Sequence, residues 1–165
     1  MGCPGHIVTR RHRVRSVIGF RRTLGLIEEL VKTMISSAEE FVELRRSERQ
    51  EEYLRAVQEN APREVWLEVI QRFPDMRFWV AQNKTVPVEV LAVLAHDPDS
   101  RVRSMVAMKN KLTDDLFALL AIDQDDSVRA RLAHNKKVPS EILKRLSRDQ
   151  SQVVSAAARE RLDQS

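Results

Sequence analysis

Asp97–Leu120, DPDSRVRSMVAMKNKLTDDLFALL, is the stretch that decides the fold, because its pattern returns at a spacing of 26 residues. Its opening, residues 97–103 (DPDSRVR), aligns with residues 123–129 (DQDDSVR) and then, more loosely, with residues 149–155 (DQSQVVS). The three copies align without an insertion. A fixed period of roughly 20–50 residues is the sequence signature of stacked-repeat folds.

Each copy of the period contains two short helical segments, so the sequence predicts a two-helix repeat. The first segment begins with Pro or Thr and the second with Asp or Ser, residue types that favour helix starts. The first kind spans 87–95, 113–121 and 139–147, and the second kind 75–82, 99–109, 125–135 and 151–162. Helices of about ten residues are marginal alone, so stacking on neighbours must stabilise them.

Helices that differ from the repeat are predicted before it. Apolar residues at helical spacing begin at Leu24, and Ser37 with Glu40 forms a capping box. The predicted helices are 24–34, 38–46, 48–59 and, as a degenerate repeat helix, 62–72. We therefore expect N-terminal capping helices over 24–60 and tandem repeats over 61–165.

Residues 1–23 form a basic leader. Residues 1–33 carry seven basic and two acidic residues, whereas residues 34–165 carry 21 basic and 22 acidic residues. Four interpretations of the leader stay open: a poorly ordered tail, an extension due to start-site choice with Met34 as the alternative start, an arm for nucleic acid or anionic surfaces, and a transit peptide. The near-neutral remainder argues against a dedicated nucleic-acid binder.

Composition excludes several classes of site. Cys3 is the only cysteine, so the chain alone offers no disulfide, cysteine zinc site or iron–sulfur cluster, and we expect a cytoplasmic protein. There is no apolar run of about 18 residues and no signal-like segment, so no membrane association is expected. His96 and His134 are not spaced as a ligand pair, and no glycine-rich phosphate loop or serine beside a base occurs. We expect no catalytic residue, metal or cofactor.

The repeats resemble HEAT-like repeats, and more closely the variant leucine-rich repeat. The match runs from Asn83-Lys84-Thr85-Val86-Pro87 to Val102-Arg103, and residues 135–139 (NKKVP) repeat its start. The resemblance covers roughly residues 60–162 and implies an all-α, right-handed superhelical solenoid. It does not extend to the cysteine cluster of the best-known variant-repeat protein, because Cys3 stands alone. Some HEAT-like stacks are DNA glycosylases for alkylated bases, although no matching catalytic carboxylate is found here.

The second helix of each repeat carries an arginine that we interpret as structural. Projected as a helix, Arg103 lies in the same arc as the apolar Val102 and Val106, and Arg129 occupies the same position one repeat later. A buried guanidinium needs an acidic partner. By resemblance to HEAT-like stacks, we expect these arginines to pair with Asp97, Asp123 or Asp149. A ladder that grips phosphates is the minority alternative.

The opposite arc of these helices supplies the candidate interaction face. The resemblance implies that the second helices line the concave side, where aromatic residues, Met and Arg are typical of interfaces. The candidates are Phe78, Trp79, Arg101, Met105, Met108, Arg131 and His134. The alternative for the two aromatic residues is that the N-terminal helices cover them.

Five lysines in the loops between repeats form a second candidate surface. They are Lys84, Lys109, Lys111, Lys136 and Lys137. Such an edge can follow a phosphate backbone, although nearby acidic residues dilute it. We therefore expect a non-catalytic module that binds another protein or peptide on the concave helices. The alternative is a HEAT-like nucleic-acid binder related to the alkylated-base glycosylases.

Overall fold

The computed structural model describes residues 34–164, which are helical apart from their loops and contain no β-strand. The chain divides into two units, Met1–Thr33 and Met34–Ser165, and all helices given below belong to the second. The basic leader and nearly all of the predicted helix over 24–34 lie outside the described residues. The prediction of an all-α fold is confirmed for the part described.

Ten α-helices and one 3₁₀ turn follow each other along the described residues. They are α2 (Ala38–Arg46), α3 (Gln50–Gln58), α4 (Arg63–Arg72), η1 (Pro74–Met76), α5 (Arg77–Gln82), α6 (Val88–Leu94), α7 (Ser100–Ala107), α8 (Asp114–Leu120), α9 (Asp126–Ala133), α10 (Ser140–Leu146) and α11 (Gln152–Asp163). All predicted helix bounds in this range agree with the structure to within two residues, but the segment predicted over 75–82 does not begin as an α-helix. There Pro74, which lacks an N–H and has a fixed φ, begins a 3₁₀ turn before α5.

The predicted capping box at the start of α2 is present with a shifted partner. The Oγ atom of Ser37 accepts a hydrogen bond of 3.1 Å from the backbone N–H of Glu40. The Glu40 carboxylate bonds back to the N–H and the hydroxyl of Ser36, at 2.8 and 2.7 Å, and not to the N–H of the cap residue itself. Two otherwise unpaired donors at the helix start are thereby satisfied.

Two of the second helices, α7 and α9, are capped by aspartates. The carboxylate of Asp99 accepts from the N–H of Arg101 at the start of α7, and that of Asp125 from the N–H of Ser127 at the start of α9, both at 2.9 Å. Thr113 caps α8 through its hydroxyl. These caps explain why the helices begin at the same position in successive repeats.

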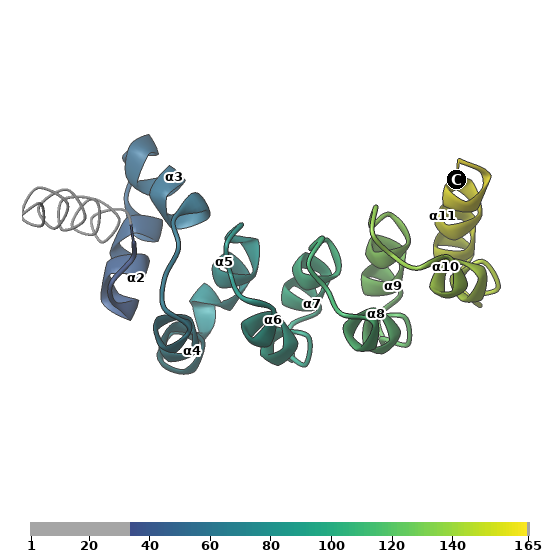
Figure 1. Cartoon of the computed structure of the whole chain (residues 1–165), viewed down its shortest axis with the longest axis horizontal. Coiled ribbons are helices and arrows are strands. Elements are labelled where there is room, and N and C mark those ends of the chain that lie inside the picture. The colour runs from purple at the N-terminus through teal and green to yellow at the C-terminus, as the bar shows by residue number, and fades with distance from the viewer. Residues whose placement is uncertain (1–33, 165) are drawn as a thin grey trace, which may run out of the picture. The chain divides into compact units, whose positions relative to one another are not determined.

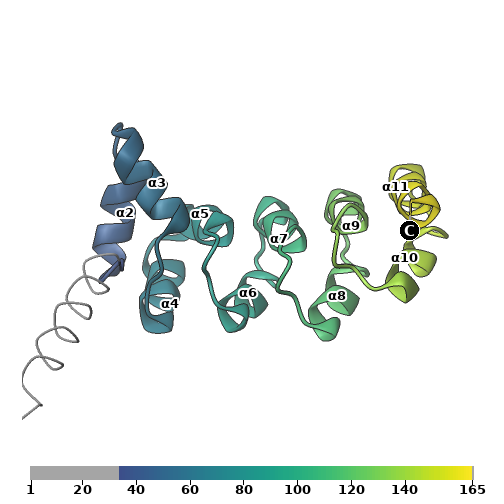
Figure 2. The ribbon, with the colours of Figure 1, turned by 45° about the horizontal axis from the view of Figure 1, so that its top comes forward.

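Helices α5, α7, α9 and α11 lie side by side in one row, each packed on the next, while α6, α8 and α10 form a second row (Figures 1 and 2). The first row buries two equivalent residues from each helix or the turn before it. These residues are Met76, Val80, Val102, Val106, Val128, Leu132, Val154 and Ala158. Val102 and Val106, the apolar residues in the same arc as Arg103, are buried as the helical projection predicts, and the 26-residue period corresponds to one step along the row.

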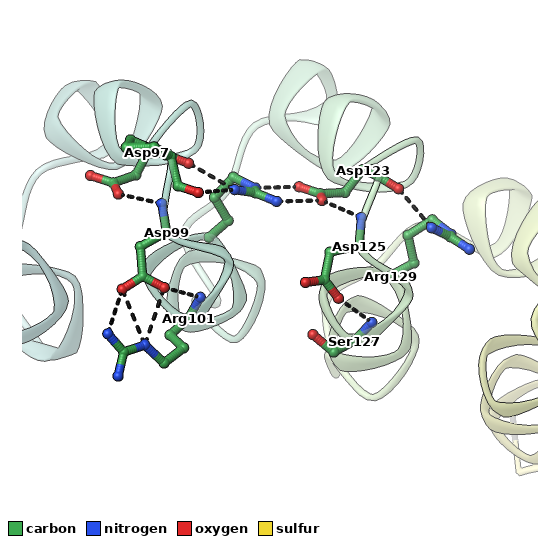
Figure 3. A network of polar contacts seen from close by, with 9 residues as sticks. Asp97, Asp99, Arg101, Asp123, Asp125, Ser127 and Arg129 are labelled. Atoms are coloured by element: carbon green, nitrogen blue, oxygen red, sulfur yellow. Dashed lines mark hydrogen bonds and ion pairs between the residues drawn. The ribbon is translucent and has the colours of Figure 1, made fainter.

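A ladder of arginine–aspartate pairs joins neighbouring repeats (Figure 3). Arg103 bonds to both carboxylate oxygens of Asp123, at 2.7 and 2.9 Å, and also donates to the backbone carbonyl of Asp97 at 2.8 Å. Arg129 repeats this arrangement with Asp149, at 2.8 and 2.9 Å. Both guanidinium groups are buried, as expected from the sequence. The hydrogen bond from Arg129 is the chief cause that lowers the pKa of Asp149.

Buried asparagines form a second set of links, which the sequence reasoning did not identify. The side-chain N–H groups of Asn83 donate to the carbonyls of Ala56 and Glu59, at 2.9 and 3.0 Å. Those of Asn135, two periods later, donate to the carbonyls of Ala107 and Lys109, at 2.7 and 2.9 Å. Each asparagine thus satisfies carbonyls at the end of a preceding helix.

No helix between residues 34 and 164 combines the length and hydropathy that a bilayer span requires. The longest of those given above, α11, has 12 residues.

Candidate functional site

A hollow of about 340 Å³ opens across α5, α7 and α9, on the face that the sequence singles out. Its apolar lining comes from Phe78 of α5 and from Met105 and Met108 on and just after α7. Its polar lining residues are Ser100, Arg101, Ser104, Ser127 and Arg131. We call this the apolar hollow. It lies on the opposite side of α7 from the buried Val102 and Val106, so the pattern that fills the core also defines this face.

A second hollow, of about 310 Å³, adjoins the first, because Met108 and Arg131 line both. Its remaining lining residues are Asn110, His134, Asn135 and Lys136, from the loops that follow α7 and α9. We call this the basic hollow, and the two together the groove. The structure therefore brings six of the seven predicted face residues to one continuous surface.

The cations of the groove differ in how far they are already paired. Arg101 is held by Asp99, with a shortest N–O distance of 2.8 Å, and this contact raises the pKa of the guanidinium further. Arg131 is exposed and makes no ion pair with any residue in the range 34–164. Arg131 is thus a charged donor that remains available to a ligand.

Trp79 is the predicted face residue that does not line the groove. The guanidinium of Arg45, from α2, lies 3.3 Å from the centre of the Trp79 ring, and it also lies 4.4 Å from the ring of Tyr53 in α3. Phe78 packs edge-on against the same ring, with centroids 5.0 Å apart. Trp79 is half-buried under this cation–π contact, which fits the alternative that the N-terminal helices cover it, and its ring does not line the groove.

Four of the five candidate phosphate-binding lysines are exposed. They are Lys84, Lys111, Lys136 and Lys137. The fifth, Lys109, does not belong to this exposed edge. Its Nζ atom donates to the backbone carbonyls of Gln82 and Asn83, at 3.0 and 2.7 Å. It occupies the repeat position that Asn83 and Asn135 hold in the neighbouring repeats. Burial, with a smaller effect of Lys111, lowers the pKa of Lys109 to about 8.

A larger hollow of about 760 Å³ lies at the starts of α7, α9 and α11. It is lined by Arg103 and Arg129, both already paired within the ladder, together with Asp125 and Asp126. Asp126 in turn accepts from the Ser151 hydroxyl at 2.9 Å. Because its charged groups already have partners, this hollow is a weaker candidate for ligand binding than the groove.

No group of three or more His, Cys, Asp or Glu side chains among residues 34–164 is placed to hold a metal ion. His96 lies in the turn after α6 and His134 at the end of α9, in different hollows.

Compared with protein families, curated proteins and solved structures, the chain shows no significant match.

Proposed function

We propose that this protein is a non-catalytic interaction module that holds a segment of a partner protein in the groove. The observation that carries the proposal is the apolar hollow, in which the half-buried Phe78 and Met105 and the exposed Met108 lie beside Arg131. Such side chains next to arginine are typical of the centres of protein interfaces. Met108 is 48% exposed, although it directly follows a helix whose other large apolar residues are packed into or against the core.

The architecture that we propose with this function is a right-handed α-solenoid of HEAT-like or variant leucine-rich repeats. Three observations support it: the period of 26 residues, the row in which α5, α7, α9 and α11 pack in order, and the recurring Arg–Asp pairs. In such a stack each repeat contacts only its neighbours and leaves a long surface for binding. A cytoplasmic location is part of the proposal and is supported by the single cysteine.

The test is affinity capture from cell lysate with the full chain, with and without nuclease, comparing the unmodified protein with Met108→Asp. The matched control is Val93→Asp, because Val93 is also 48% exposed but lies on α6 in the other row. We expect a protein that is retained after nuclease treatment, lost with Met108→Asp and kept with Val93→Asp. Equal loss with both variants, or no protein that depends on Met108, would refute the groove as the binding site.

The alternative is a nucleic-acid binder that uses the lysine edge. It is favoured by the exposure of Lys84, Lys111 and Lys137, none of which has an ion pair within the described range. Under this alternative the affinity for nucleic acid falls steeply with salt concentration. Replacing these three lysines with glutamate should abolish binding only if this alternative holds. The near-neutral charge of residues 34–165 and the internal bonds of Lys109 weigh against it.

A further inference from the structure

The groove differs in charge from every other hollow described in this part of the molecule. Each of three other hollows is lined by carboxylates. The hollow at the starts of α7, α9 and α11 contains Asp125 and Asp126. A second, formed by the turns after α8 and α10, contains Asp123 and Asp149, and a third, which His96 lines, contains Asp97 and Asp123. Neither part of the groove is lined by a carboxylate. Residues 34–165 carry slightly more acidic than basic groups, so a lining without acids is a local property of the groove and not a reflection of composition.

The groove cations that have no carboxylate partner in the described chain lie at one end of it, whereas Arg101, which lines the apolar hollow, is paired with Asp99. Arg131 forms the border between the two hollows, and Lys136 and His134 line the basic hollow beyond it. Arg131 and Lys136 are both exposed, and neither has an ion pair within residues 34–164. By contrast, Arg129, two positions before Arg131 on the same helix, is buried and bonded to Asp149.

The apolar and the basic parts are continuous through Met108, so one extended ligand can occupy both. An apolar side chain that packs against Phe78 and Met105 would place the neighbouring residues of the same segment beside Arg131. An anionic group at that point gains a charge-assisted hydrogen bond to Arg131 that no carboxylate between residues 34 and 164 makes. A ligand that fills the groove therefore places an apolar side chain in the apolar hollow and an anionic group beside Arg131.

We propose that the occupant of the groove is an acidic linear peptide segment, in which a large apolar side chain fills the apolar hollow and a nearby Asp or Glu pairs with Arg131 and Lys136. This inference rests on the proposed function and names the chemistry of its partner. The chain's own residues 1–33 do not fit this description, because they carry seven basic residues and only two acidic ones. A peptide is favoured over nucleic acid because three large apolar side chains, Phe78, Met105 and Met108, line the apolar hollow.

The experiment selects binders of the full chain from a random dodecapeptide library displayed on phage. Enriched peptides are synthesised with a fluorophore and titrated against the unmodified chain, Met108→Asp, Arg131→Glu and the controls Val93→Asp and Arg63→Glu. Arg63 is an exposed arginine at the start of α4, away from the groove. Circular dichroism of each variant confirms that it folds.

We expect enriched peptides that combine an aromatic or large aliphatic residue with Asp or Glu. Their affinity should fall roughly tenfold or more with Met108→Asp and roughly five- to tenfold with Arg131→Glu, and it should stay unchanged in both controls. A peptide in which Glu is replaced by Lys should bind Arg131→Glu better than it binds the unmodified chain. This exchange of preference identifies the charge contact itself, because damage to the fold would weaken both peptides.

Two other outcomes are distinguishable. Peptides that depend on Met108 but are neutral or basic, or are indifferent to Arg131→Glu, would overturn the acidic assignment and leave the proposed function standing. Absence of any peptide that depends on Met108 would count against both. An oligo-dT strand that binds with the same dependence on Met108 and Arg131 would overturn the assignment to a peptide.

Discussion

The ladder and the groove lie on opposite sides of the same helices, yet their arginines behave in opposite ways. Arg129 is buried and bonded to Asp149, whereas Arg131, on the same turn of α9, is exposed and has no ion pair in the described chain. The ladder position holds Arg in three repeats, while the position of Arg131 changes along the stack from Met105 to Arg131 to Ala157. Positions that recur hold the repeats together, and positions that vary are free to bind a ligand.

The largest expected effect comes from removing one acid of the ladder. Asp123→Ala leaves Arg103 buried without its carboxylate, and we expect the free energy of unfolding to fall by about 3–5 kcal/mol. Urea denaturation measures this loss. Arg131→Ala is the matched change on the groove side and should cost less than about 0.5 kcal/mol. Similar losses for both would show that the two faces do not differ in the way described.

The second expected effect concerns the asparagine links. Asn135→Ala leaves the carbonyls of Ala107 and Lys109 without their donor, so we expect a loss of about 2–3 kcal/mol in urea denaturation. Asn110, which is exposed and lines the basic hollow, provides the control. If Asn110→Ala is as destabilising as Asn135→Ala, burial of the side-chain amide is not the cause.

The repeat register explains what could be predicted from the sequence. Helix bounds and the buried face at Val102 and Val106 follow once three copies are superposed, because the pattern recurs after 26 residues. The resemblance to HEAT-like stacks supplied three candidate aspartates for the buried arginines, and the structure selects Asp123 as the ion-pair partner of Arg103. The face that carries Met105 and Met108 follows from the same projection. What the structure adds is that the hollows on this face are joined and contain no carboxylate.

Trp79 and Lys109 depart from their predicted surfaces for different reasons. Trp79 is covered by Arg45 of α2, a helix outside the repeat, so no register relates the two residues. Lys109 stands where Asn83 and Asn135 stand in neighbouring repeats. A lysine in a loop resembles a surface residue, and only the alignment of these three positions could have indicated that its side chain replaces a buried amide.

Lys109 allows a test of that replacement by pH. Burial lowers its pKa from the usual 10.5 of a lysine to about 8 in the folded protein, so between these values the unfolded chain binds more protons and stability rises with pH. Lys109→Asn restores the residue of the neighbouring repeats and removes this dependence. We expect the stability of the unmodified protein relative to Lys109→Asn to rise by about 1 kcal/mol from about pH 7.5 to pH 10, reduced by partial exposure.

The measurement is urea denaturation of both proteins at each pH, since subtracting one from the other removes the titration of groups that they share. A difference that does not change with pH would mean that the carbonyls of Gln82 and Asn83 keep the ammonium charged despite its burial. Lys109 would then stay charged in the folded protein, and the stability difference between Lys and Asn at this position would be the same at every pH tested.

The smallest expected effect on stability is the one that separates the two faces most clearly. Met108→Asp places a charge on a side chain that is 48% exposed, so thermal and urea denaturation should change by less than about 0.5 kcal/mol, as for Val93→Asp. Val106, two residues earlier and fully buried, tolerates no such change. A loss of more than about 1 kcal/mol with Met108→Asp would assign Met108 to the packing of α7 against its neighbours. An unchanged stability together with lost peptide binding would instead show that the same helix serves the stack on one side and the ligand on the other.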